Sequence, residues 1–160
     1  METTFRRATG ADRDVAHRLL ADQLVEHRLP ADAEGIRRGI DAALLPHSPA
    51  WLWLAEREGR AVGVFLANRI VSVEKGGYAL WVEELYVVPE ERRTGVARAL
   101  LTRIRDEARK EGIRALDLEV VPTQAAALAL YEALGFEKVN RLRMSLPLHG
   151  ITTEPPVSDR

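Results

Sequence analysis

The sequence contains no cysteine, which excludes disulfide bonds, thiolate metal ligands and a cysteine nucleophile. It also has no excess of charge of one sign, because 23 basic and 24 acidic residues leave a net charge of -1. Proteins that bind nucleic acids without sequence preference carry a basic excess, so we expect neither DNA nor RNA as a partner. No apolar run reaches the ~18–20 residues that a membrane-spanning helix needs.

The N-terminus lacks the pattern of a secretory signal, because Met1 to Arg7 has no apolar region behind its charges. We therefore expect a cytoplasmic protein without membrane association. The 160 residues, of which 46% are hydrophobic, suffice for one globular domain with a buried core. We expect this domain to cover 1–148 and a flexible tail to cover 149–160, where Pro155 and Pro156 stand among polar residues.

Helical and strand patterns alternate along the domain. Apolar residues recur at helical spacing over 12–28, 32–45, 94–111 and 122–134. Strands are predicted over 4–8, 50–55, 61–71, 78–88 and 115–121, with a last strand or hairpin over 136–148. An antiparallel meander followed by β-α-β crossovers makes the fold class α/β, also described as α+β, on a mixed sheet.

The most informative stretch is the loop that leads from the third long strand into the third helix. Gly95 and Ala97 have little or no side chain, so a ligand can approach the backbone closely there. A helix N-terminus offers unpaired N–H groups and a positive dipole end to a phosphate, and Arg92, Arg93 and Arg98 add positive charge. A plain turn with solvated arginines is the alternative. The stretch is neither a Walker loop nor a dinucleotide fingerprint, since it lacks the following lysine and the further glycines.

Two motifs in this region carry a family resemblance. Arg92-x-x-Gly95-x-Ala97 resembles the acetyl-CoA loop of the GNAT superfamily of N-acetyltransferases, Gln/Arg-x-x-Gly-x-Gly/Ala. Further on, Leu-Tyr131-x-x-x-Gly-Phe136 is similar to the block that ends the fourth helix of that family. The motifs have the family's order and spacing, and the close resemblance covers residues 81–136.

The resemblance implies the GNAT fold, with a mixed, mostly antiparallel sheet of about six to seven strands, four flanking helices and a cleft where strands 4 and 5 splay apart. It also implies acetyl-CoA as co-substrate. Two departures from the family pattern are present: the third small residue of the loop is Ala97 rather than glycine, and Gln124 stands where many members have asparagine.

By the same resemblance, acetyl-CoA lies along the backbone of strand 4 and over the loop. The implied cofactor contacts are Leu85, Tyr86, Val87, Arg92, Arg93, Thr94, Gly95, Val96, Ala97, Arg98, Gln124, Ala127 and Tyr131. One backbone N–H of the strand can also polarise the thioester carbonyl, as in an oxyanion hole. The histidines show no metal-ligand spacing, and we expect no metal.

Acetyl transfer to an amine, which the resemblance implies, requires two proton transfers, because the amine must lose a proton and the departing thiolate must gain one. Tyr131 is the predicted acid, on the strength of its place in the Leu-Tyr-x-x-x-Gly-Phe block. The alternative is a core aromatic beside Leu130 and Leu134.

Glu83 and Glu84 are the predicted base or acceptor anchor. Adjacent carboxylates in an apolar strand are unusual, because a buried carboxylate without a partner costs free energy. Alternation places the two on opposite faces unless a bulge intervenes. Their segment is similar to the corresponding strand of spermidine/spermine N-acetyltransferases, which favours Glu83 and leaves Glu84 in reserve. A structural salt bridge to an arginine is the alternative.

Glu26 and His27, near the end of the first helix, are the predicted acceptor contacts, because the first two helices flank the acceptor cleft in this family. A surface histidine is the alternative for His27. We therefore expect an N-acetyltransferase of a small cationic amine, with acetylation of a protein N-terminus or lysine as the rival within the class. A non-catalytic acyl-CoA-binding sensor module is the alternative from another class. The resemblance also implies a homodimer.

Overall fold

The protein is described by a computed structural model that covers residues 2–29 and 32–149. The helices are α1 (Arg13–Glu26), α2 (Ala33–Ala43), α3 (Val96–Lys110) and α4 (Ala125–Ala133), with the short 3-10 helices η1 (Gly10–Asp12) and η2 (Pro89–Glu91). The strands are β1 (Thr3–Arg7), β2 (Ala50–Arg57), β3 (Arg60–Ser72), β4 (Gly77–Val87) and β5 (Ala115–Leu118). The predicted alternation of helices and strands is thus confirmed for these elements.

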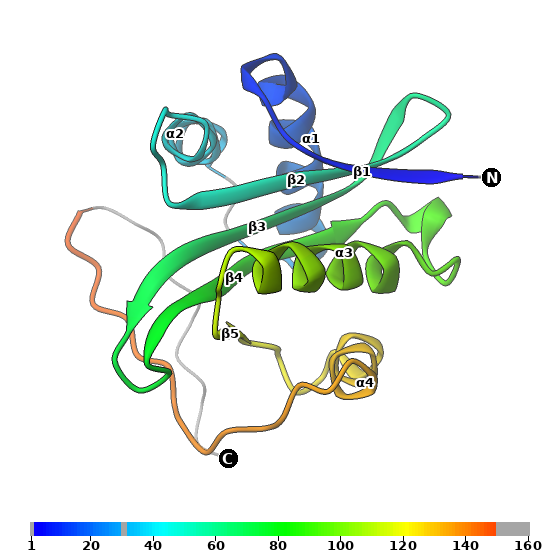
Figure 1. Cartoon of the computed structure of the whole chain (residues 1–160). Coiled ribbons are helices and arrows are strands. Elements are labelled where there is room, and N and C mark those ends of the chain that lie inside the picture. The colour runs from blue at the N-terminus through cyan, green and yellow to red at the C-terminus, as the bar shows by residue number, and fades with distance from the viewer. Residues whose placement is uncertain (1, 30–31, 150–160) are drawn as a thin grey trace.

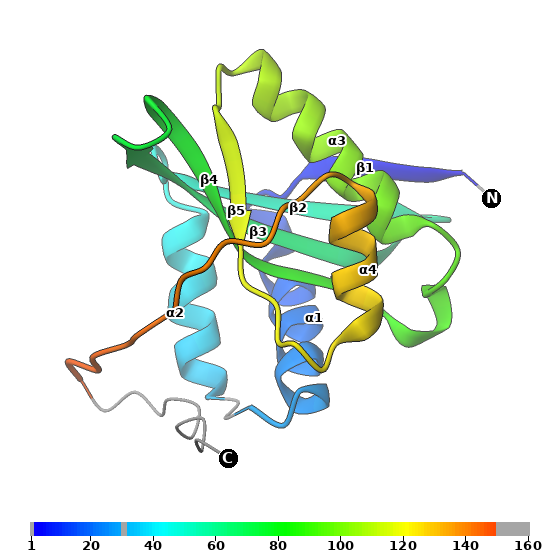
Figure 2. The ribbon, with the colours of Figure 1, turned by 90° about the horizontal axis from the view of Figure 1, so that it is seen from below.

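The strands form one twisted sheet in the order β1-β2-β3-β4-β5. The first three pairings are antiparallel and the last, between β4 and β5, is parallel. Helices α1 and α2 cover one face of this sheet, and α3 and α4 cover the other (Figures 1 and 2). The helices of both layers and the strands contribute side chains to one hydrophobic core. Phe65 of β3, Leu19 of α1 and Leu100 of α3 are fully buried in it. Burial of each such side chain stabilises the fold by about 1.5–3 kcal/mol.

Strand β4 carries one residue more than the strand that it pairs with. Leu66 of β3 pairs with Glu84 and Ala67 pairs with Val82, which leaves Glu83 as the extra residue of a β-bulge. On the opposite edge, pairing with β5 ends at Val82 and Leu118. The predicted separation of strands 4 and 5 is therefore confirmed, and it begins at the bulge.

The expected number of six to seven strands is wrong for the part of the chain that the structure describes, where the sheet has five. The last strand or hairpin predicted over 136–148 is absent, because residues 137–149 form neither helix nor strand. Leu142 and Met144 of that segment are 93% and 92% exposed, so no apolar burial holds them against the sheet. Strand β5 also ends before the predicted 121, since β4 diverges after Val82. The predicted tail over 149–160 lies almost wholly outside the described residues.

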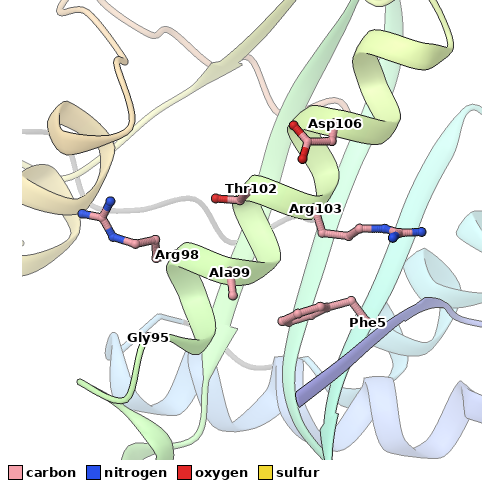
Figure 3. A pocket seen from close by; sticks show the side chains of 7 residues that line it. All are labelled: Phe5, Gly95, Arg98, Ala99, Thr102, Arg103 and Asp106. Carbon is pink, nitrogen blue, oxygen red and sulfur yellow. The ribbon is translucent and has the colours of Figure 1, made fainter. Parts of the chain in front are cut away.

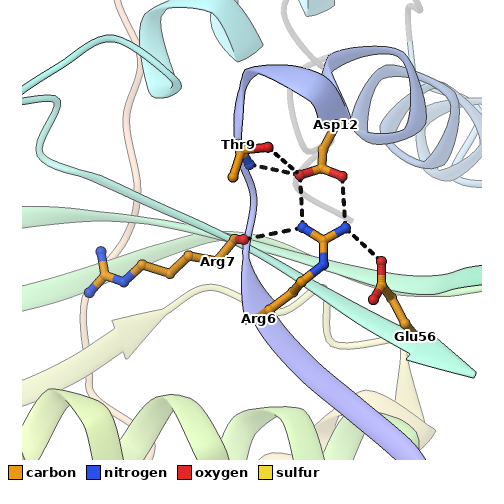
Figure 4. A network of polar contacts seen from close by, with 5 residues as sticks. All are labelled: Arg6, Arg7, Thr9, Asp12 and Glu56. Carbon is orange, nitrogen blue, oxygen red and sulfur yellow. Dashed lines mark hydrogen bonds and ion pairs between the residues drawn. The ribbon is translucent and has the colours of Figure 1, made fainter. Parts of the chain in front are cut away.

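A network around Arg6 joins β1, η1 and β2 (Figure 4). The Arg6 guanidinium donates two hydrogen bonds of 2.8 Å to the carboxylate of Asp12 and one of 2.6 Å to Glu56. Asp12 also accepts from the backbone N–H of Thr9 at 2.7 Å. The Arg6 charge and these hydrogen bonds hold the pKa of Asp12 well below its usual range.

Replacement of Asp12 by asparagine should lower the free energy of unfolding by about 1–2 kcal/mol at pH 7, because the charge-assisted pair with Arg6 is lost. A depressed carboxyl pKa contributes stability above the unfolded-state value of about 3.9, and that contribution is lost as the pH falls. The gap between the two proteins should therefore close toward pH 2 in urea titrations. Asp41→Asn is the control, because Asp41 pairs with Arg13 where both side chains are nearly half exposed. Equal losses in the two variants would contradict this role of Asp12.

Candidate functional site

The loop between β4 and α3 presents a row of free backbone N–H groups. Gly95 caps α3 in the left-handed region at φ 89°, and no atom lies within 4 Å of where a side chain on it would begin. The first helical hydrogen bond runs from Ala99 N–H to the Gly95 carbonyl. Within the described chain, the N–H groups of residues 93–98 have no backbone acceptor. Such a row at a helix N-terminus suits a phosphate or another anion.

The side chains of this loop divide into two groups. Neither Arg93 nor Arg98 has an ion-pair partner among the described residues, and both are exposed. Arg98 extends from α3 on the side that faces α4 (Figure 3). Thr94 donates its hydroxyl to the Glu91 carbonyl at 2.7 Å, and Ala97 is half-buried in the first turn of α3. The loop therefore keeps two cations available beside its free N–H groups.

Arg92 is directed away from this anion site. Its Nη2 donates to Glu26 of α1 at 2.6 Å, and its Nε donates to the Val87 carbonyl at 2.9 Å. Its guanidinium also lies over the ring of Tyr86, 5.5 Å from the centroid. The charge and hydrogen bonds of Glu26 raise the pKa of Arg92. The Arg92 side chain, which the motif predicted to contact the cofactor, thus connects the end of β4 to α1.

The open edge of β4 lies beyond the last β5 contact. Val88 N–H donates to the Val62 carbonyl of β3, so Val88 and, by alternation, Tyr86 turn their backbone groups toward β3. Leu85 and Val87 then turn theirs toward the cleft. The Val87 carbonyl already accepts a hydrogen bond from Arg92. The groups left for a ligand are therefore the N–H and the carbonyl of Leu85 and the N–H of Val87.

The bulge separates the environments of the two adjacent glutamates. Glu83 is exposed, whereas Glu84 is partly buried. Burial, and next the charge of Glu83, raise the pKa of Glu84 to about 7, against the opposing effects of the Gln23 hydrogen bond and the Arg143 charge. A carboxyl group that titrates near neutral pH can take up and release a proton under ordinary conditions. This environment favours Glu84 over Glu83 as the base.

Tyr131 of α4 lies within electrostatic reach of Glu84. Burial, followed by the Glu84 charge, raises the pKa of Tyr131. Its ring packs edge-on against Phe136 with 5.5 Å between the centroids. Tyr131 therefore has the packing contacts of a core aromatic as well as a place beside the buried carboxyl.

The C-terminal end of α1 carries residues that act on several parts of the site. Glu26 pairs with Arg92 of the loop, and Nε2 of His27, the residue that follows the helix, lies 3.4 Å from Nε2 of Gln124 at the start of α4. The predicted acceptor contacts Glu26 and His27 are thus engaged with residues predicted to bind the cofactor. Gln23, which lowers the pKa of Glu84, was not predicted, although it is a polar residue on the apolar stripe of this helix.

The C-terminal segment brings charged side chains close to β4 and to the residue after β5. Arg143 pairs with Glu119 at 2.7 Å, and its guanidinium lies 5.9 Å from the centroid of the Trp81 ring. Earlier in the same segment, Arg141 pairs with Glu74 at 3.0 Å. These contacts place a guanidinium near Glu84, and neither Arg143 nor Glu119 was predicted.

We call residues 88–95, which connect β4 to α3, the anion loop. A shallow depression of about 440 Å³ lies beside it, between β1 and the first turns of α3. Its lining includes Gly95, Arg98 and Phe5 (Figure 3). Neither Glu84 nor Tyr131 lines it. The depression therefore adjoins the phosphate side of the candidate site and is separate from the proton-transfer groups.

Among residues 2–29 and 32–149, no group of three or more histidine and carboxylate side chains could hold a metal ion. No helix of this part of the chain is long and apolar enough to cross a membrane.

Ala127, the last predicted cofactor contact, is half-buried on α4.

Comparison with known proteins adds relatives of described activity. The Acetyltransferase (GNAT) family profile matches residues 16–136. The ribosomal protein bS18-alanine N-acetyltransferase of Escherichia coli K12 is 46% identical over 61 residues, or 38% of this chain and 41% of that protein. IAA acetyltransferase of Azospirillum brasilense is 41% identical over 83 residues, 52% of each. N-acetyltransferase 8 of Homo sapiens is 30% identical over 102 residues, 64% of this chain and 45% of that protein. The chain thus spans about half the length of these relatives.

Solved structures match over nearly the whole chain. A possible acetyltransferase from Clostridium difficile 630 superposes with a TM-score of 0.82 at 22% identity, covering 93% of this chain and 99% of that one. A predicted acetyltransferase from Clostridium acetobutylicum, solved with acetyl-CoA, has a TM-score of 0.76 at 19% identity, covering 92% and 97%. At these identities the likeness establishes the fold, which confirms the α/β class expected from the sequence.

Replacement of Glu84 by glutamine should stabilise the protein above neutral pH. Because the folded-state pKa of about 7 lies above the usual carboxyl value, the folded protein binds the proton more tightly. Wild-type stability should therefore fall as the pH rises from about 4.5 to 8. Glu84→Gln should escape that loss and exceed wild type by about 2 kcal/mol at pH 8, with convergence near pH 4. Parallel urea titrations measure this difference. Glu137→Gln, at an exposed carboxylate, is the control, and a Glu84→Gln advantage that does not vary with pH would refute the assignment.

Proposed function

The chain belongs to the acetyltransferase (GNAT) family, and on that premise we propose that it transfers an acetyl group from acetyl-CoA to the amine of an acceptor. One observation carries the proposal: the bulge of β4 sets a partly buried Glu84 within electrostatic reach of Tyr131, where the edge of the strand becomes free. A titratable carboxyl and a phenol at a free strand edge supply the base and the acid that acetyl transfer requires. A sensor module that only binds acyl-CoA has no need of this pair.

The described residues fit acetyl-CoA on two counts. The free N–H groups of residues 93–98 and the side chains of Arg93 and Arg98 suit its pyrophosphate. The open strand edge at Leu85 and Val87 suits the amide groups of its pantetheine arm. When bound, acetyl-CoA supplies the acetyl group as a thioester.

Glu84 takes a proton from the acceptor ammonium, directly or through water, and frees the lone pair that attacks the carbonyl carbon. The new C–N bond forms as the C–S bond breaks. Tyr131 gives its hydroxyl proton to the departing sulfur. One N–H of β4, from Leu85 or Val87, stabilises the charge that develops on the carbonyl oxygen.

The acceptor in this proposal is a small cationic amine. Its support is the set of carboxylates at the open end of the cleft, where Glu83 is exposed beside Glu84 and Glu119 lies near Trp81 through its Arg143 partner. A second candidate acceptor is the N-terminus of a protein. The 46% identity over 61 residues to an enzyme described as a ribosomal protein bS18-alanine N-acetyltransferase favours it.

The roles of the two glutamates can be separated by kinetics. Glu84→Gln should lower kcat by roughly 10²–10³ and remove the acidic limb of its pH profile, because the base must be ionised and its pKa is about 7. The matched variant Glu83→Gln should leave most of kcat and raise KM for a diamine, more strongly at low salt. Thiol release over a panel of diamines and alanine-initiated peptides measures both effects. If neither variant changes any rate, the proposed base is wrong, and a higher kcat/KM for the peptide would favour the second acceptor.

The anion loop can be tested against an internal standard. Gly95→Val should weaken acetyl-CoA binding by roughly tenfold or more, because the added side chain enters the space beside the N–H row. It also forces a β-branched residue to a φ of 89°, which costs stability by itself. Gly112→Val, at φ 71° and the other end of α3, carries the same backbone penalty far from the loop. Calorimetry with CoA should show weakened binding for Gly95→Val alone, and equal affinities would remove the loop from the cofactor site.

The proposal includes a homodimer. Its support is the row of exposed apolar side chains in the C-terminal segment, which a second copy of the chain could bury. They are Val139, Leu142, Met144, Leu146 and Leu148, all at least 71% exposed. Strand β5 beside them lies at the end of the described sheet.

Light scattering should give about twice the chain mass of 17.9 kDa. The double variant Leu142→Asp with Met144→Asp should halve that mass, because it places charges in the contact. Val25→Asp is the control, since Val25 is 67% exposed on α1, away from the segment. A wild-type mass of one chain at micromolar concentration would refute the dimer.

A further inference from the structure

The side chain of Arg92 is held by three contacts before any ligand binds. Its Nη2 donates to Glu26 of α1 at 2.6 Å, and its Nε donates to the Val87 carbonyl at 2.9 Å. The guanidinium also lies 5.5 Å from the centroid of the Tyr86 ring, which is 6% exposed and therefore offers a fixed surface. A side chain held in this way contributes to the shape of the site as well as to its charge.

The hydrogen bond to Val87 stands where a neighbouring strand would otherwise pair. Val88 N–H is bonded to the Val62 carbonyl of β3, so the Val87 carbonyl points to the opposite edge of β4. Pairing with β5 on that edge has already ended. Arg92 thus occupies the last carbonyl of the strand, and the N–H and carbonyl of Leu85 and the N–H of Val87 are left before it.

We propose that Arg92 is a positioning residue, which closes the open edge of β4 at Val87 and thereby sets the register in which the pantetheine arm of acetyl-CoA pairs with the strand. This inference rests on the proposed function, because it takes the edge at Leu85 and Val87 as the place of the arm. A strand edge repeats its pattern of N–H and carbonyl groups every two residues, so pairing on it can slip by roughly 7 Å. An occupied Val87 carbonyl removes the register that would use it.

Glu26 keeps Arg92 in this place. The two side chains are 39% and 38% exposed, and an isolated ion pair at such a site contributes little stability. The planar guanidinium, however, donates to Glu26 and to Val87 at once, so the two bonds together fix one orientation. Because Glu26 also balances the Arg92 charge, the phosphates of the cofactor are left to Arg93 and Arg98.

The kinetic test is Arg92→Met, which keeps the length of the side chain and removes both hydrogen bonds. If the arm can then also pair at the Val87 carbonyl, part of the bound acetyl-CoA holds its thioester roughly 7 Å from the productive place. Such non-productive binding should lower kcat and the KM for acetyl-CoA by the same factor, about threefold, and leave kcat/KM unchanged. The factor should be larger with S-acetyl-pantetheine, because this substrate lacks the pyrophosphate that anchors the other end of the arm.

Other roles of Arg92 would give different kinetics. A direct contact with the cofactor phosphates would raise KM and lower kcat/KM, which is the result expected for Arg93→Met. A purely structural role would lower kcat/KM together with the melting temperature. Either result for Arg92→Met overturns the inference.

Two further variants test the origin of the effect. Glu26→Gln should lower kcat and KM together by a smaller factor, because Arg92 loses its charged partner but keeps its own donors. Arg60→Met is the control, since Arg60 is 61% exposed and lies 3.7 and 3.8 Å from the carboxylates of Glu90 and Glu91 in η2. Its removal should change neither constant, and a threefold fall of both would overturn the inference.

The register can also be read without catalysis, from the 13C shift of the Val87 carbonyl. Addition of CoA should leave this shift unchanged in wild type, where Arg92 occupies the oxygen, and should move it in Arg92→Met. Calorimetry should give Arg92→Met an affinity for CoA equal to or above that of wild type. A Val87 carbonyl that responds to CoA in wild type, or not at all in Arg92→Met, overturns the inference and leaves the proposed function standing. A wild-type protein that binds no CoA overturns the proposed function as well.

Discussion

The extra residue in β4 is the feature on which the rest of the site depends. Without Glu83 the strand would continue in register with both neighbours, and its edge would be used in pairing to β5. The bulge raises the local twist, so β4 separates from β5 after Val82 and the backbone groups of Leu85 and Val87 lose their strand partner. It also turns Glu84 inward toward α1 and leaves Glu83 in solvent. One inserted residue thus makes both the open edge and the buried carboxyl.

In the proposed reaction, the electrostatic coupling between Glu84 and Tyr131 gives the two proton transfers an order. While Glu84 is ionised, its charge raises the pKa of Tyr131 and makes the phenol a poorer acid. Uptake of the amine proton neutralises Glu84 and removes that effect, so Tyr131 becomes a stronger acid at the stage when sulfur departs. The proposed base step therefore prepares the acid step through electrostatics alone. Partial burial of both groups strengthens the effect, because water screens it less than at the surface.

Local patterns predicted the elements and the resemblance supplied the candidate site residues, but neither predicted long-range pairings. Helices α1 and α3 lie within two residues of their expected limits, because apolar periodicity reports the buried face directly. The strand expected over 136–148 failed, since its alternating residues need a second surface that the chain does not supply. Gln23 escaped notice because Glu84, whose pKa it lowers, is 61 positions away in the sequence. The contact of Arg92 with Glu26 was not predicted, because the motif specifies no partner for that side chain within the protein.

Helix α1 connects two parts of the candidate site, the end of β4 and Glu84. Glu26 holds Arg92, and Arg92 holds the Val87 carbonyl at the end of the open strand edge. One turn earlier in α1, Gln23 lowers the pKa of Glu84 on the same strand. Because a helix moves as a rigid unit, a shift of α1 would act on both β4 residues. Helix α1 therefore links the proposed base to the strand edge that we propose for the cofactor.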